Sequence, residues 1–293
     1  MKFGYWYASV GPFAYPEGAV RLALAAESAA IESLWTGEHV AVPAGYESTY
    51  PYSESGRMAG DGAVPMAEPM VWYSFIAAKT ERLRFVTGVL VLPQREPVLV
   101  AKQAATLAVL SGERFSLGIG AGWLREEFAA LGADFSSRAR RMDEYVGAMR
   151  ALWASDQADF KGEFVSFEQL QMSPRPASGQ VPIIVGGHTE AAARRAGRLG
   201  DGFFPAKGSP EELARLFDIA RETAVAHNRD PEALEFTVHD PRTLDSALAA
   251  EAVEEWRKIG VGRVLISPTT FDLGEVVEEI ARFGEEVIAH VQD

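Results

Sequence analysis

The 293-residue chain contains no cysteine, and that absence excludes several kinds of chemistry. Without thiols there is no disulfide framework, no cysteine nucleophile and no thiolate ligand for a metal ion. Histidine is scarce too: the chain has five, and none of them forms an HxH or HExxH pair of the kind that binds zinc. We therefore expect no metal site.

Long apolar runs and an excess of positive charge are also missing. No run of about 18 apolar residues occurs, and Met1-Lys2 leads into FGYWY rather than into a signal peptide, so we expect no membrane span and a cytoplasmic protein. A net charge of −13 disfavours nucleic acid and anionic membrane surfaces as partners. An anionic ligand would need a local group of basic side chains or backbone amides.

The sequence does contain a regular alternation of short apolar runs and helical patterns. Its clearest unit spans residues 83–122, where a β-branched run, a helix at 97–110 and a second apolar run ending in glycines follow one another. Two buried strands joined by a helix predict a parallel pair with a crossover. Strands are predicted at residues 3–7, 33–36, 83–92, 115–119, 182–185, 202–205, 234–239 and 263–267.

Eight strands that alternate with helices predict an α/β fold. We expect a (β/α)8 TIM barrel with insertions rather than an open doubly wound sheet, and one domain over residues 1–293, since no linker-like composition divides the chain. The insertions are a loop at residues 40–64 and an irregular stretch at 154–180 with a hairpin-like patch at 160–167. In this fold the site lies at the carboxyl ends of the strands.

Two candidate site segments follow from that rule. Glu38 and His39 close the second predicted strand, which favours a catalytic role, although a histidine satisfied within its own loop is the alternative. Gly88-Val89 interrupts the third strand. A glycine there indicates either a bulge that approaches a ligand or a requirement of barrel packing.

Glycine-rich turns follow two further strands. The glycines Gly118, Gly120 and Gly122 resemble a dinucleotide-binding fingerprint, but they close the fourth strand, so we expect a tight loop at the barrel mouth rather than a Rossmann fold. Gly186-Gly187-His188-Thr189 precedes a predicted helix, whose backbone amides predict a phosphate site. An ordinary helix cap at Thr189 is the alternative.

Basic and aromatic side chains lie on the predicted mouth loops. The basic ones are candidates to hold an anion, and any one of them could instead be a solvated surface charge. They are Arg57, Arg95, Arg125 and Lys207. The aromatic ones could form a lid or simply pack the loops; they are Tyr46, Tyr50, Tyr52 and Trp123.

Together these segments resemble the luciferase-like monooxygenase superfamily, most closely its branch that uses the deazaflavin coenzyme F420. The matching stretches, within residues 1–205, include TGEHV, YPYSESG, TGVLVLPQREPVLVAKQAATLAVLSGERFSLGIGAGWLREEF and PIIVGGHTEAAARRAGRLGDGF. The segment from Glu235 onwards matches only in its alternation of strands and helices. The resemblance implies a barrel with deazaflavin or flavin at its carboxyl mouth and hydride transfer between F420 and a small organic substrate.

The resemblance also implies roles for individual residues. Glu38 and His39 correspond to an acid–histidine pair that contacts the ring or the substrate. Gly88-Val89 corresponds to a non-prolyl cis peptide behind the ring. The loops Gly120-Ala121-Gly122 and Gly186-Gly187-His188-Thr189 correspond to segments that approach the cofactor's phosphate.

One departure and two alternatives qualify these expectations. Trp123 stands where some sugar-phosphate dehydrogenases of the superfamily carry a glutamate proton donor, so the same substrate is not expected, and His39 or Glu38 is the candidate donor. The alternatives are a monooxygenase that uses FMN supplied by a reductase, and a non-catalytic relative that only binds a cofactor. A homodimer is expected through the helices at residues 65–79 and 97–110, on large apolar groups that include Met66, Met70, Trp72, Phe75 and Val100.

Overall fold

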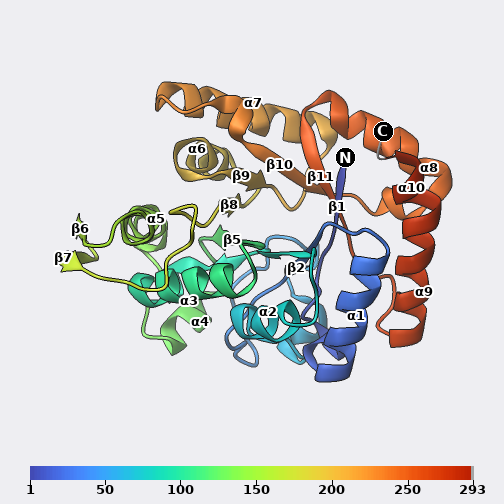
Figure 1. Cartoon of the computed structure of the whole chain (residues 1–293), viewed down its shortest axis with the longest axis horizontal. Helices are drawn as coiled ribbons and strands as arrows, with labels where there is room; N and C mark the ends of the chain where they lie inside the picture. The colour runs from blue at the N-terminus through green and yellow to red at the C-terminus, as the bar shows by residue number, and fades with distance from the viewer. Residues whose placement is uncertain (292–293) are drawn as a thin grey trace.

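The computed structural model describes residues 1–291 and shows parallel strands enclosed by helices (Figure 1). The strands are β1 Lys2–Tyr5, β2 Ser33–Thr36, β3 Arg84–Thr87, β4 Leu90–Val91, β5 Phe115–Gly120, β8 Ile183–Gly186, β9 Gly202–Phe204, β10 Glu235–His239 and β11 Val261–Ile266. The helices are α1 Pro16–Ser28, α2 Pro69–Ala77, α3 Pro97–Leu110, α4 Arg125–Ala130, α5 Arg138–Ala154, α6 Glu190–Leu199, α7 Pro210–Ala226, α8 Ser246–Lys258, α9 Leu273–Phe283 and α10 Ala289–Val291.

The strands form a closed ring. They pair in the order β3-β2-β1-β11-β10-β9-β8-β5, and β3 pairs with β5 to complete the circle. The short β4 continues the line of β3 and also pairs with β5, so the barrel has eight strand positions. The predicted (β/α)8 barrel is confirmed. The antiparallel hairpin of β6 Ala158–Lys161 and β7 Ser166–Leu170 lies outside the helices, beside α5 (Figure 1).

Two element predictions were wrong in extent. The third strand does not run unbroken over residues 83–92, because it stops at Thr87 and resumes as β4 after Gly88-Val89. The helix expected from residue 65 begins only at Pro69, where the Glu68 side chain caps it by accepting from the Val71 amide at 2.8 Å. Between β5 and the hairpin the chain forms two helices, α4 and α5.

Local chemistry explains where the helices start. Proline occupies a first-turn position of α1, α2, α3 and α7, where its missing N–H has no partner to lose. At the start of α7, Ser209 and Glu212 form a complete capping box. None of the helices within residues 1–291 is long and apolar enough to cross a bilayer.

The interior of the barrel is filled in layers. Arg263 closes the amino-terminal end; it is 3% exposed and forms ion pairs with Glu32 and Glu235 at 3.0 and 2.9 Å. Above it lies a buried apolar layer of Trp35, Val86, Ile184, Phe204 and Leu265. The next layer, Trp6, Val89 and Ala206, is only partly buried. It forms the floor of an opening at the carboxyl ends of the strands.

Gly118→Ala should destabilise this barrel, because a Cβ at residue 118 would lie 1.7 Å from the carbonyl oxygen of Thr87 on the neighbouring strand. We expect the free energy of unfolding to fall by about 3 kcal/mol, as for an overpacked core. Gly262→Ala is the control, since its Cβ would meet nothing closer than 3.6 Å. Urea denaturation measures both, and equal midpoints for the two variants would contradict the prediction.

Candidate active site

A cavity of about 1000 Å³ opens at the carboxyl ends of the strands. The structure brings the residues predicted for catalysis and for cofactor binding to its wall, although they come from four separate segments of the chain. They are Glu38, His39, Gly88, Val89, Gly120, Ala121, Gly122, Gly186, Gly187, His188 and Thr189. Within the described part of the chain, no group of three or more His, Cys, Asp or Glu side chains is placed to hold a metal ion.

Val89 forms the centre of the cavity floor. The Gly88–Val89 peptide is cis, as the family resemblance predicted. The Val89 side chain occupies the space that side chains at two of the predicted phosphate-loop glycines would need: a Cβ at Gly120 or at Gly186 would lie 2.6 Å from a Val89 methyl carbon. Trp6 donates from its indole N–H to the Gly88 carbonyl at 3.0 Å. These two glycines therefore have a packing reason that the sequence did not reveal.

His39 is held by an acid that the sequence analysis did not single out. Its Nδ1 lies 3.0 Å from Oε2 of Glu127, in the first turn of α4, and the Glu127 side chain is 1% exposed. Oε1 of the same carboxylate accepts from the Val40 and Ala41 amides at 2.6 and 3.1 Å, and Gln94 donates to Oε2 at 3.1 Å. Because a carboxylate can only accept hydrogen bonds, His39 carries its proton on Nδ1 and donates it to Glu127. The other ring nitrogen, Nε2, has no hydrogen bond to Glu127.

Two opposing effects act on the Glu127 carboxyl. Burial by itself raises the pKa of Glu127, but hydrogen bonds from His39, Gln94 and the backbone outweigh it and hold that pKa below its usual value. The carboxyl is therefore ionised at neutral pH. Residue 127 lies 88 positions from His39 in the chain, so no local spacing in the sequence could have linked the two.

Both carboxylate oxygens of Glu38 have partners within the fold, which does not suit a proton donor. One carboxylate oxygen accepts from the Val91 amide at 2.8 Å, and the other pairs with the Arg95 guanidinium. Arg95 was a candidate anion holder, but it lies on Glu38 and does not line the cavity. Arg125 is also outside the cavity, over the Phe135 ring. Arg95 is thus used inside the fold, whereas Arg125 lies exposed on the surface.

The start of α6 presents groups that suit an anion. Gly187 has φ +121, and the Thr189 side chain accepts from the Ala192 amide at 3.2 Å, so the predicted ordinary cap is present. Beside it, Nδ1 of His188 is buried without a hydrogen-bond partner. Burial lowers the pKa of His188, and Lys207 lowers it further. An unpartnered buried nitrogen, free helix amides and a nearby ammonium fit a phosphate or carboxylate group.

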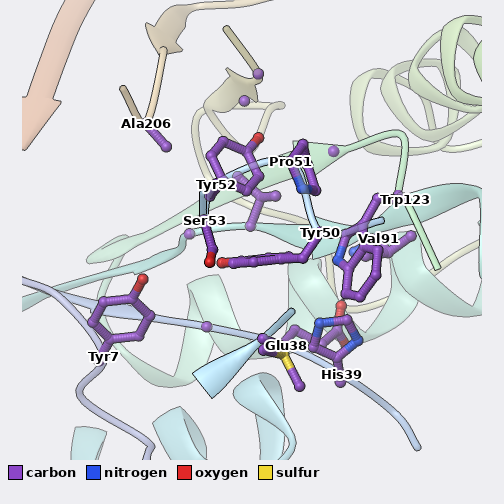
Figure 2. Close-up of a pocket in the computed structure, with 18 of the residues that line it drawn as sticks. Tyr7, Glu38, His39, Tyr50, Pro51, Tyr52, Ser53, Val91, Trp123 and Ala206 are labelled. Atoms are coloured by element: carbon purple, nitrogen blue, oxygen red, sulfur yellow. The ribbon is translucent and has the colours of Figure 1, made fainter. Parts of the chain in front are cut away.

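A segment of the long loop covers the cavity. Figure 2 shows Tyr50, Pro51, Tyr52 and Ser53 lying across it, between Tyr7 on one side and Trp123 above His39 on the other. Ring contacts continue through the group, from Tyr50 to Trp123 at 5.1 Å and from Tyr52 to His188 at 5.1 Å. Lys207 donates to the Pro51 carbonyl. The lid interpretation of these aromatic residues is the one that this packing favours.

The fold and this site define a barrel enzyme with a covered cavity at its strand ends, and comparison with known proteins gives its family. The chain belongs to the luciferase-like monooxygenase family, whose model matches residues 1–268. An uncharacterized protein of Mycobacterium tuberculosis is 35% identical over 93% of this chain and 95% of its own length.

Two characterised relatives differ in the cofactor that their names specify. An F420-dependent glucose-6-phosphate dehydrogenase of Amycolatopsis mediterranei is 31% identical over 87% of this chain and 71% of the relative. An FMNH2-dependent dimethylsulfone monooxygenase of Pseudomonas fluorescens is 32% identical over 64% of this chain and 52% of the relative. The solved structure of an F420-dependent secondary alcohol dehydrogenase with an F420-acetone adduct superposes with a TM-score of 0.80 over 100% of this chain and 99% of that chain; at 19% identity this similarity shows the fold.

Glu127→Gln should cost stability at neutral pH and little in acid. The folded pKa of Glu127 is lowered, so its ionised form stabilises the fold above the ordinary glutamate pKa, and this contribution is lost as the pH falls through the lowered pKa. We expect a loss of about 2 kcal/mol at pH near 7, typical of hydrogen bonds to a buried charge, that shrinks towards pH near 3.

The control for this measurement is Glu254→Gln, which removes an exposed carboxylate from α8. Urea denaturation of both variants across the pH range separates the buried pair from a general effect of charge. A loss at Glu127 that stays constant with pH would show that its ionisation is not what stabilises the fold.

Proposed function

We propose that this protein is an F420-dependent oxidoreductase that transfers a hydride between the deazaflavin and a small organic substrate. The observation that carries the proposal is the His39–Glu127 pair, in which Glu127 holds His39 at the wall of the same cavity as the apolar Val89 platform. The similarity to the F420-dependent relative over most of the chain supports the choice of cofactor.

The residues present fit a deazaflavin. Val89 offers a flat apolar surface against which a ring can lie, and the absence of side chains at Gly120 and Gly186 keeps that surface level. The start of α6, with His188 and Lys207, suits the anionic groups of the cofactor. When bound, a reduced deazaflavin supplies a hydride and reacts poorly with oxygen, whereas reduced FMN reacts readily with it.

The chain supplies the proton in this reaction. Because Nδ1 of His39 donates its proton in a hydrogen bond to Glu127, His39 can accept or return a second proton at Nε2, and the buried carboxylate stabilises the charged ring while it does so. Glu38 is a weaker candidate, since Val91 and Arg95 already occupy its two oxygens. The aromatic lid shields the site from water.

His39→Asn should separate chemistry from binding. We expect F420 to bind the wild-type protein and this variant equally, within about twofold, while turnover falls by roughly 10² to 10⁴, the usual contribution of a general acid or base. Equilibrium titration followed by fluorescence measures binding, and the loss of reduced F420 with a panel of small ketones and aldehydes measures turnover.

His227→Asn is the matched control, because His227 is exposed at the end of α7 and its ring bonds to the Thr223 carbonyl of that helix. Titration of FMN in parallel decides between cofactors: tight FMN binding with oxygen uptake would replace our proposal by the monooxygenase alternative. Cofactor binding without turnover on any substrate would favour the non-catalytic relative.

We also propose that the protein forms a homodimer through α2 and α3, whose outer faces carry exposed apolar side chains. Val71 is 70% exposed, Leu99 56% and Phe75 44%. Of the apolar groups on which the sequence prediction relied, three are instead buried in the chain's own core, since they face the barrel: Met70, Trp72 and Val100. Met66 lines the cavity.

Leu99→Glu should therefore convert a dimer into a monomer, because it places a charge in the middle of this face. Leu248→Glu on α8, 45% exposed, is the control and should leave the dimer intact. Small-angle scattering at micromolar concentration reports the mass in each case. A wild-type protein that is already monomeric would contradict this proposal.

A further inference from the structure

The cavity has a second wall, which neither the Val89 platform nor the His39–Glu127 pair uses. It is built at the ends of β1, β9, β10 and β11, and its members are mainly aromatic: Trp6, Tyr7, Phe204, His239 and Phe271. Trp6 is its centre. The Trp6 ring stacks on Tyr7 at 4.4 Å and 17°, and meets Phe204 and His239 edge-on at 5.1 and 5.2 Å.

This aromatic wall is uncharged. Burial lowers the pKa of His239, against a weaker opposing effect of Asp240, so the imidazole is neutral at physiological pH, and its Nε2 lies 3.1 Å from the Ser267 hydroxyl. The cations that line the cavity are attached elsewhere. Arg195 pairs with Asp143, Arg57 lies over the Tyr46 ring, and Lys207 reaches the lid.

Tyr7 supplies the wall with one polar group. Its backbone has φ 60, uncommon for a bulky residue, and the turn is fixed by hydrogen bonds from the Ala8 amide to Trp35 and from the Val10 amide to the Tyr7 carbonyl. The hydroxyl points into the cavity (Figure 2), and within residues 1–291 it has no hydrogen-bond partner. Burial, with Tyr50 and Tyr52 nearby, raises the pKa of Tyr7, so this hydroxyl stays a donor.

We infer, on the basis of the proposed function, that the substrate is a neutral ring compound with a carbonyl or hydroxyl oxygen, and that Tyr7 determines specificity by donating to an oxygen of it. The flat apolar face of such a ring can pack against the aromatic side chains of this wall. A carboxylate or phosphate placed there would be desolvated without a cation to pair with, in a protein of net charge −13, and is therefore rejected.

The test uses acetophenone and benzoate, which share a ring and differ in the charge of the oxygen-bearing group. Both are titrated into the cofactor-free protein, with quenching of tryptophan fluorescence as the readout, since Trp6 and Trp123 line the cavity. We expect acetophenone to bind at least about tenfold more tightly than benzoate. Tyr7→Phe should weaken acetophenone binding by about five- to tenfold, the usual effect of losing one neutral hydrogen bond.

Tyr15→Phe is the matched control, because Tyr15 is 58% exposed and outside the cavity. Tyr7→Phe removes a hydroxyl without an internal partner, so folding is preserved, and a thermal melt checks this. Equal affinity for benzoate, undetectable acetophenone binding, or an unchanged affinity in Tyr7→Phe would each overturn the inference. The assay needs no cofactor, so its result is independent of whether F420 or FMN binds; conversely, His39-dependent turnover of an anionic substrate would keep the proposed function and reject this substrate class.

Discussion

A closed parallel barrel must fill its own interior, and at the carboxyl end of this barrel Val89 does so together with Trp6 and Ala206. Val89 projects inward between two neighbouring strands, and the residues that face it, Gly120 and Gly186, can carry no side chain because Val89 occupies that space. Trp6, which follows β1 two strand positions from β3, donates to the adjacent Gly88 carbonyl. The interior packing therefore ends in a level apolar surface. The existence of a cavity above this surface, and its shape, depend on that single point of packing.

Helix α4 connects the chemistry of the site to its cover. Its two neighbouring carboxylates both accept from the loop that follows β2, but at different places. Glu127 accepts hydrogen bonds from His39 and from the two backbone amides that follow it. Glu126 accepts from the amides of Glu47 and Ser48 and from the Ser48 hydroxyl. The bond from the Ser48 hydroxyl is the main reason that the pKa of Glu126 falls to about 2. The imidazole and the base of the lid are thus attached to the same helix turn. A shift of α4 would therefore move both the His39 imidazole and the base of the lid.

The sequence was informative wherever a signal is local. Alternation of apolar runs with helices predicts the barrel, and polar or glycine-rich turns after the strands predict the residues around its cavity, since parallel strands end at one edge. Pairings between distant segments could not be predicted. Glu127 is one acid among several at a predicted helix start, and the reason for Gly120 is a methyl group of Val89, in a different segment of the chain. Tyr7 was expected inside the first strand, yet β1 ends at Tyr5, and the turned backbone beyond it is what aims the hydroxyl into the cavity.

The charged groups around the cavity of this acidic protein lie on different walls according to their sign. Positive groups lie near the start of α6 and against the loop that covers the cavity, the ionised acid lies behind His39 rather than in front of it, and the wall around Trp6 has no charge. Trp123 completes this arrangement. Its ring packs edge-on against His39 at 5.6 Å, at a position where an acidic side chain would place a second negative charge beside the imidazole. With an indole there, Glu127 supplies the carboxylate that the His39 ring contacts, and it does so from behind the ring, outside the cavity.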